Sequence, residues 1–212
     1  MNSASATIAA RLYLRNGTHP DHVRLNQHPL LSGMTRPGYE LASYQRVLSA
    51  YFHFYRTIEA AIDQALAAGV SGFVYEARRK LPWIVCDLEH FAIDPASLVD
   101  RPYIPAVQFS FADEGALLGT LYTIEGSSLG GQVISRYLAE HLALTPAAGG
   151  RFFHGYGAQT LLFWEEFETF LNAALSSESA RRSALAAAKS TFAMMESVLD
   201  EYPDRNKPPS SP

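Results

Sequence analysis

Residues 121–138 read LYTIEGSSLGGQVISRYL, a segment with apolar residues at helical spacing but with Gly126, Gly130 and Gly131 in its interior. Each interior glycine costs a helix about 1 kcal/mol relative to alanine. Two interpretations stay open on these residues alone. The glycines let a second helix pack closely, or, with Ser127 and Ser128 beside them, they mark a bend whose backbone meets a ligand.

The composition is that of a globular chain of 212 residues, with 48% hydrophobic and 18% charged residues. The formal net charge of −4 gives no electrostatic reason to expect nucleic acid or an anionic membrane as a partner. No apolar run approaches the roughly 20 residues that span a bilayer, and no basic segment followed by an apolar block marks a secretory signal. We therefore expect a cytoplasmic protein.

A single cysteine, Cys86, excludes an intrachain disulfide and is typical of a reducing compartment. Because Cys86 lies in the apolar run LPWIVCDL at 81–88, we expect a buried thiol.

Helix signals are plentiful along the chain, strand signals are scarce, and no repeat or linker divides it. The pattern predicts one all-α, single-domain bundle of stacked helices over residues 1–202 and a disordered tail over 203–212. A break at Asn16-Gly17 should separate a first helix from one that begins at Thr18 as N-cap. Pro82 should kink or restart a helix, and Ser110 should cap the helix that carries the opening segment. The predicted helices cover 5–15, 18–27, 39–69, 73–92, 110–144, 158–175 and 179–201, with an irregular connection over 93–109 and a loop over 149–157.

Seven histidines are scattered along the chain, and two of them lie near the start of the predicted helix 18–27. His22 could serve there as a single axial ligand to a heme iron. His19 could form a metal pair with it, but neither a cysteine nor a third ligand accompanies the two. The 12 Phe, 11 Tyr and 2 Trp residues fit an ordinary core or a flat hydrophobic pocket.

Hydrolytic and phosphate-binding motifs are absent from the sequence. No strand-like segment precedes GSSLGG, as a serine nucleophile elbow would require. Gln132 stands where a P-loop needs lysine, and no H-E-x-x-H occurs. Glu165 and Glu166 are expected on a solvated helix face.

Three blocks of this sequence together resemble the heme oxygenases. LRNGTHPDHVRL at 14–25 is similar to the family's early pattern L-R-x-x-T-x-x-x-H-x-x-L, and GSSLGGQV at 126–133 is similar to its distal G-x-x-x-G-G followed by Q-V. The variant E-G-S-x-L-G-G resembles that of bacterial enzymes associated with bacteriophytochromes. FFHGYGAQTLLFWEEF at 152–167 resembles the family's Y-G…W-x-x-F region, so the resemblance covers about residues 11–175.

The resemblance implies a heme-oxygenase-like bundle in which His22 is the axial ligand of the heme iron and the glycine helix lies across the opposite face of the heme. Gly126, Ser127, Gly130 and Gly131 would form this distal wall, where the missing side chains leave room for dioxygen to be steered toward a meso carbon of the porphyrin. Heme is then both cofactor and substrate. The implied reaction opens it to biliverdin and releases CO and Fe²⁺, with electrons from an external reductase or ferredoxin.

The chain departs from the family pattern at three positions. Ser127 replaces an aspartate that many relatives carry, and Asn26 replaces a glutamate that orients the imidazole, a task for which Asn26 can accept through its amide oxygen. Pro20 interrupts a region where the family has one unbroken helix. Arg15 matches a basic position that pairs with a heme propionate, and Tyr122, one turn before Gly126, is a second propionate partner by its position on the helix.

Three function classes stay open: a heme oxygenase, a heme carrier or sensor without turnover, and a helical protein with a thiamine-related hydrolytic site or a di-iron centre. The third class needs a catalytic cysteine or several inward-facing glutamates and histidines, which the sequence does not supply. The resemblance also leaves open whether the product supplies a bacteriophytochrome or the reaction supplies iron.

Overall fold

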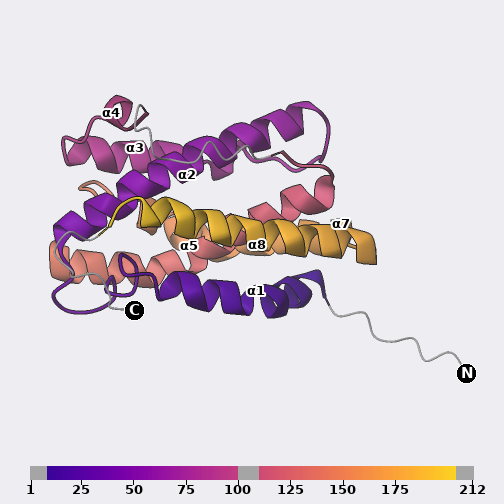
Figure 1. Cartoon of the computed structure of the whole chain (residues 1–212), viewed down its shortest axis with the longest axis horizontal. Coiled ribbons are helices and arrows are strands. Elements are labelled where there is room, and N and C mark those ends of the chain that lie inside the picture. The colour runs from indigo at the N-terminus through magenta and orange to yellow at the C-terminus, as the bar shows by residue number, and fades with distance from the viewer. Residues whose placement is uncertain (1–8, 100–109, 204–212) are drawn as a thin grey trace, which may run out of the picture.

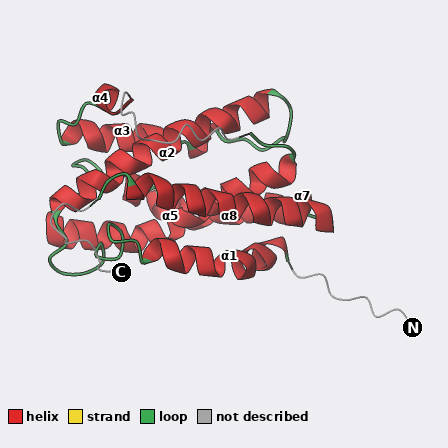
Figure 2. Cartoon of the chain, in the orientation of Figure 1, coloured by secondary structure: helices red, strands yellow, loops and turns green. Residues whose placement is uncertain are grey.

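The long helices pack side by side around a central pair. Figure 1 shows α5 (Glu114–Leu142) and α8 (Glu178–Asp200) in the middle of the molecule, with α1 (Ala10–Asn26) on one side and α2 (Leu41–Ala67) and α3 (Leu81–His90) on the other. This computed structural model describes residues 9–99 and 110–203, which form helices and loops and no strand (Figure 2). The predicted all-α fold is therefore confirmed. The shorter elements are η1 (Glu76–Arg78), α4 (Pro95–Val99), α6 (Arg151–His154) and η2 (Gly157–Gln159), followed by the longer α7 (Thr160–Ala174).

Small residues bring α5 and α8 into close contact. A Cβ atom added to Gly119 would lie 1.9 Å from the carbonyl oxygen of Ala184, and one added to Gly115 would lie 2.6 Å from that of Ala180. The two helices are also joined by a buried hydrogen bond of 3.0 Å between the hydroxyls of Thr120 and Thr191. Glycine is therefore required in the first half of α5 because the backbone of α8 occupies the space of a side chain.

The predicted break at Asn16-Gly17 is wrong, since α1 is one continuous helix. Gly17 lies where α8 packs, and a Cβ there would come within 2.5 Å of the Leu185 side chain. Thr18 is not an N-cap either: it is buried inside the helix, and its hydroxyl donates to the Leu14 carbonyl at 2.8 Å. The helix continues past Pro20 because its packing on α8 stabilises it more than the local propensity of proline destabilises it.

Other predicted boundaries are confirmed or corrected by the caps. The predictions for α2, α7 and α8 agree with the structure to within two residues at each end. Asp113, not Ser110, caps α5, because its carboxylate accepts from the Ala116 amide at 2.8 Å. The predicted helix 73–92 is wrong before residue 81, because that stretch holds only the short turn η1 (Glu76–Arg78) and loop residues. Pro82 marks a fresh helix start at α3 as expected.

Two buried carboxylates cap the N-termini of helices that have no cap from a neighbouring side chain. Glu59 of α2 accepts from the amide of Lys80 at 2.6 Å, at the start of α3. Asp87 of α3 accepts from the amides of Arg151 and Phe152, both at 2.8 Å, and so begins α6 inside the predicted loop 149–157. These long-range caps are invisible to local sequence patterns, and they position α6 beside the central helices.

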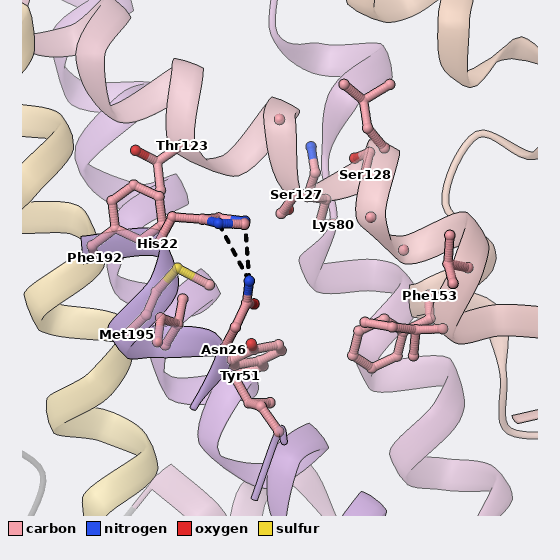
Figure 3. A pocket seen from close by; sticks show the side chains of 18 of the residues that line it. His22, Asn26, Tyr51, Lys80, Thr123, Ser127, Ser128, Phe153, Phe192 and Met195 are labelled. Atoms are coloured by element: carbon pink, nitrogen blue, oxygen red, sulfur yellow. Dashed lines mark hydrogen bonds between the residues drawn. The ribbon is translucent and has the colours of Figure 1, made fainter. Parts of the chain in front are cut away.

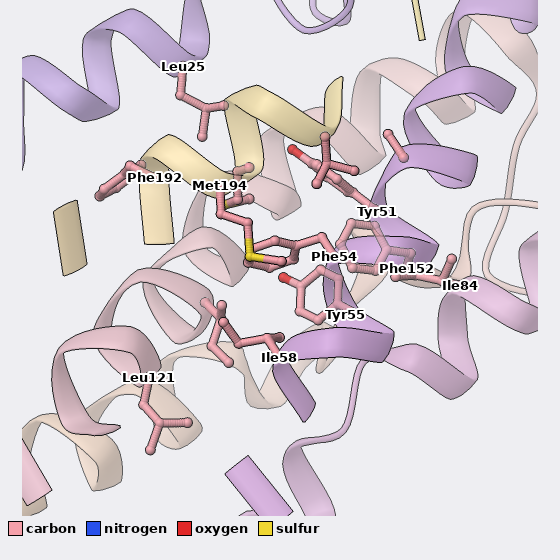
Figure 4. Close-up of a cluster of buried hydrophobic side chains, with 14 of the residues drawn as sticks. Leu25, Tyr51, Phe54, Tyr55, Ile58, Ile84, Leu121, Phe152, Phe192 and Met194 are labelled. Carbon is pink, nitrogen blue, oxygen red and sulfur yellow. The ribbon is translucent and has the colours of Figure 1, made fainter. Parts of the chain in front are cut away.

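The hydrophobic core runs along α2, where aromatic side chains pack edge to face with those of α6 (Figure 4). The expectation of a buried thiol is wrong: Cys86 is exposed, because the buried face of α3 is carried by its neighbours Ile84, Asp87 and Leu88. Part of the predicted connection 93–109 is the helix α4, and its residues 100–109 lie outside the described residues. So do residues 5–8 of the first predicted helix and 204–212 of the predicted tail. Among the helices that the structure describes, none combines the length and the apolar character needed to cross a bilayer.

Candidate functional site

A cavity of about 850 Å³ lies between α1, α2, α5, α6 and α8. Its size is within the range of small-molecule and cofactor sites. It brings together side chains and backbone from residue 11 to residue 195, so it exists only in the folded chain. All eight candidate residues border it, namely Arg15, His22, Asn26, Tyr122, Gly126, Ser127, Gly130 and Gly131.

His22 extends from α1 into this cavity (Figure 3). Its ring keeps accessible surface because it faces the open cavity, and Phe192 of α8 meets it edge-on at 6.1 Å between centroids. Burial, reinforced by the neighbouring His19, lowers the pKa of His22 below its ordinary value of 6.5. The imidazole is thus held neutral at pH 7, which is the form that binds a metal.

Asn26 lies one turn beyond His22 and contacts its ring, but through the atom opposite to the one expected. The amide nitrogen of Asn26 is 3.3 Å from Nδ1 and 3.4 Å from Nε2 of His22. In this arrangement a ring nitrogen is the acceptor, so the predicted role of the amide oxygen as acceptor is not what the structure shows. A half-turn of the amide about its last torsion exchanges the oxygen and the nitrogen, which keeps both roles within reach of the same side chain.

The three glycines of residues 121–138 have three different environments. A Cβ added to Gly130 would meet nothing within 4 Å, and one added to Gly126 would make only an ordinary contact of 3.6 Å with the Trp164 ring. Gly131 is packed more tightly, with the Phe153 carbonyl oxygen 3.0 Å from its hypothetical Cβ. Helix packing therefore explains Gly131, whereas Gly130 and Gly126 leave cavity space empty.

Ser127 follows Gly126 on the same helix and directs its hydroxyl along the helix backbone. The hydroxyl donates to the carbonyl of Ile124 at 2.8 Å. The helix stays unbroken through the whole segment, from residue 114 to residue 142. The serines therefore do not mark an interruption, and the proton of Ser127 is already engaged.

One end of the cavity gathers polar side chains. Burial raises the pKa of Tyr122, and a hydrogen bond with Thr18 and the charges of Arg11 and Arg15 oppose this shift. Arg11 is also paired with Glu168 at 3.4 Å. Arg15 and Tyr122 both border the cavity, and Arg11, which the sequence reasoning missed, borders it as well.

A buried ionic cluster behind the cavity was also missed. Glu125 accepts from Lys80 at 2.5 Å, from Arg78 at 2.8 Å and from the Tyr156 hydroxyl at 3.0 Å. Arg78 extends the cluster outward to Glu166, which is otherwise on the solvated face expected for it. A sequence signal existed, because Glu125 follows Leu117 and Leu121 at a spacing of four and so falls on the apolar face of α5.

Comparison with known proteins identifies the family. The family model described as "Heme oxygenase" matches residues 8–201 of this chain. The chain belongs to the heme oxygenase family. A protein named "Heme oxygenase" from Xanthomonas campestris pv. campestris is 30% identical over 158 residues, which cover 74% of this chain and 88% of that protein.

Solved heme oxygenases share the fold. The heme oxygenase of Leptospira interrogans superposes with a TM-score of 0.74 at 20% identity and covers 92% of this chain and 100% of its own. The Neisseria meningitidis heme oxygenase, solved with NO and CO bound, superposes with a TM-score of 0.72 at 20% identity and covers 95% of this chain and 100% of its own. The all-α bundle is therefore the heme oxygenase fold.

Within the described residues, no group of three or more His, Cys, Asp or Glu side chains is placed to hold a metal ion. The alternative of a di-iron centre needs such a group. Membership of the heme oxygenase family therefore favours heme chemistry over a di-iron centre.

Proposed function

We propose that this heme oxygenase binds heme in the cavity with His22 as axial ligand and Gly126, Ser127, Gly130 and Gly131 as the distal wall. Family membership supports an enzyme that degrades heme. The observation that carries the site is the open space at Gly130, in a helix that borders the same cavity as the neutral imidazole of His22. When bound, heme supplies dioxygen activation and is itself the substrate, opened to biliverdin with release of CO and Fe²⁺.

His22 and Asn26 would hold the proximal side. A neutral imidazole that binds iron through Nε2 carries its proton on Nδ1, which must then donate. Asn26, whose amide is 3.3 Å from that nitrogen, would accept this hydrogen bond after turning its oxygen toward the ring. Heme binding is thus expected to reorient one amide and to leave the backbone of α1 in place.

The distal wall would act by leaving space. Glycine at 126 and 130 keeps side chains out of the cavity, so small molecules reach its centre without obstruction. Ser127 offers only its oxygen lone pairs, because its proton is donated to Ile124. The polar end of the cavity would bind the propionates, with Arg15 and Tyr122 as partners and Arg11 nearby.

The remaining partners follow from the chemistry. Ring opening consumes electrons, so a separate reductase or ferredoxin must deliver them. The resemblance of E-G-S-x-L-G-G to enzymes associated with bacteriophytochromes supports a phytochrome as acceptor of biliverdin, and a cytoplasmic location is consistent with both partners.

Hemin titration of the purified protein tests the proposal. A Soret band should appear with saturable binding, and His22→Ala should shift or weaken it. Addition of ascorbate or a reductase in air should then produce the green absorbance of biliverdin. Hemin binding without bilin would leave the second candidate, a carrier or sensor on the same scaffold. Failure to bind hemin would refute the assignment of this cavity as a heme site.

A further inference from the structure

Two histidines of α1 face the cavity. Of the seven histidines, all within the described residues, His19 and His22 border it. They are three residues apart in a helix that runs unbroken over Ala10–Asn26. Residues at this spacing lie on one helix face with their Cβ atoms about 5–6 Å apart. The proposed function uses His22 alone, so His19 is a second imidazole of the cavity wall without an assigned task.

The imidazole of His19 is available to a ligand. It is exposed, and within residues 9–99 and 110–203 it makes no hydrogen bond or ion pair with another residue. His28, the next histidine after His22, shows the contrast. One of its ring nitrogens lies 3.2 Å from Asp200, and the other accepts from the Leu30 amide at 3.2 Å. His28 would have to give up these partners to bind a metal ion, whereas His19 would not.

The charged side chains next to the two imidazoles are engaged elsewhere. Asp21, which lies between them in sequence, pairs with Arg24 at 3.0 Å, and Arg24 also contacts Glu196 of α8 at 2.9 Å. The two imidazoles therefore stand as a pair of nitrogen ligands. Imidazole suits divalent ions such as iron, and ligands three residues apart on a helix serve the same metal centre in helical bundles. A resident metal ion usually has at least three protein ligands, so two would hold an ion only weakly.

We propose that His19 and His22 together form a transient divalent-cation site that receives the ferrous ion when the opened tetrapyrrole gives it up. This inference rests on the proposed function and extends it to the release of the iron. The ion keeps its bond to His22 and exchanges a tetrapyrrole nitrogen for the imidazole nitrogen of His19. No electron is transferred, the ion stays Fe²⁺, water completes its coordination, and the tetrapyrrole nitrogens take up protons from the solvent. A weak site matches this task, because a product ion has to leave.

Arg15 makes the affinity of this pair depend on the tetrapyrrole. It lies one turn before His19 and also borders the cavity, so its positive charge repels a divalent cation bound there. Arg11, a further turn away, is already paired with Glu168 at 3.4 Å. In the proposed function a propionate neutralises Arg15. The pair therefore holds the ion best while the product is still bound, and it releases the ion when the product and its carboxylates depart.

Titration of the apoprotein with Co²⁺, followed by calorimetry, is the direct test, because Co²⁺ stands next to Fe²⁺ in ligand preference and is stable in air. His19→Ala and His22→Ala should each weaken Co²⁺ binding at least about tenfold, since either change leaves a single imidazole. His19→Glu keeps a metal ligand at this position and should stay within about threefold of the wild type. Arg15→Gln should tighten Co²⁺ binding about two- to fivefold. His141→Ala is the matched control and should change nothing, because His141 is an exposed histidine of α5 outside the residues that line the cavity.

Hemin binding separates the roles of the two histidines. His22→Ala should weaken the binding of both Co²⁺ and hemin, whereas His19→Ala should keep hemin affinity within about threefold of the wild type. His19→Ala should also slow the transfer of Fe²⁺ to a chelating dye after turnover.

Equal Co²⁺ affinity in the wild type and His19→Ala would overturn the inference, as would a loss in His141→Ala as large as that in His19→Ala. Equal losses of hemin affinity in His19→Ala and His22→Ala would do the same, because His19 would then belong to the heme site. Failure of the wild type to bind hemin, with the Co²⁺ results as expected, would instead refute the proposed function and leave a divalent-cation site.

Discussion

Substitution of Gly130 best tests whether the glycines of α5 serve helix packing or ligand binding. Alanine at this position would place its methyl group in open space, since nothing lies within 4 Å of the hypothetical Cβ. The helix would gain about 1 kcal/mol from the exchange of glycine for alanine. For a chain of this size the gain corresponds to a rise in Tm of about 2–4 °C. We therefore expect Gly130→Ala to stabilise the apoprotein in thermal unfolding followed by circular dichroism.

Gly119 is the matched control on the same helix. Its hypothetical Cβ would lie 1.9 Å from a backbone oxygen of α8, which cannot move without displacing that helix. Gly119→Ala should therefore destabilise the apoprotein by about 1–3 kcal/mol or more. The cost at Gly130 should appear only with the ligand: Gly130→Leu extends into the cavity and should weaken hemin binding at least about tenfold. Destabilisation of the apoprotein by Gly130→Ala, or full hemin affinity in Gly130→Leu, would refute the reasoning.

Three further predictions concern charge and capping. The folded state lowers the pKa of His22 below 6.5, so the unfolded chain binds the proton more readily. The free energy of unfolding of the apoprotein should therefore fall as the pH drops from 6.5 through the folded pKa. His22→Ala should lessen this pH dependence in urea titrations, and an unchanged pH dependence would contradict the lowered pKa. Glu125→Gln leaves Lys80 buried without its counter-ion and should lower the free energy of unfolding, measured in urea, by about 3–5 kcal/mol. The exposed control Glu165→Gln should change it by less than about 0.5 kcal/mol. Equal effects of the two variants would show that the cluster is not buried. Asp87→Ala removes the carboxylate that accepts from the Arg151 and Phe152 amides at the start of α6, and it should lower the free energy of unfolding by roughly 1.5–3 kcal/mol. It should also weaken hemin binding, because α6 carries aromatic residues of the cavity wall. Wild-type hemin affinity in a folded variant would show that α6 needs no cap.

The fold could be predicted largely from helical periodicity. The longest stripes, in α2, α7 and α8, have boundaries close to those expected, because amphipathic spacing extends over many turns there. Errors occurred where tertiary contacts override local signals. Gly17 and Pro20 suggest a break, yet α1 continues through both because it packs on α8. Local propensity thus failed where a neighbouring helix supplies the stabilisation.

The candidate site could be predicted where a motif carries it, and not where only the fold assembles it. His22 and the distal glycines are recognisable because their spacing reproduces the family's blocks. Tyr55 and Lys80 are about 25 residues apart in sequence and carry no motif, so only the packing of α2 against α3 shows that both border the cavity. Asn26 could be placed from its spacing to His22, but the orientation of its amide could not.

The spacing of small residues alone could not distinguish packing from ligand binding, because Gly115 and Gly119 are four residues apart, as are Gly126 and Gly130. The partner helix makes the difference. Ala180 and Ala184 of α8 are also four residues apart and provide the small surface that the first glycine pair requires.

The change from packing to cavity along α5 occurs at Glu125. Every residue from Leu117 to Leu121 is buried, whereas from Gly126 onward most residues retain accessible surface along the cavity. At this junction the carboxylate of Glu125 is held by Lys80 and Arg78 from outside the helix. Gly126 and Gly130 carry no side chain that could anchor the wall, so its position depends on the packed half of α5 before it, on this ionic anchor and, beyond Gly131, on the hydrogen bond that Gln132 donates to the His154 carbonyl at 2.7 Å. A wall held at both ends needs little further ordering when a ligand binds, which lowers the entropic cost of binding.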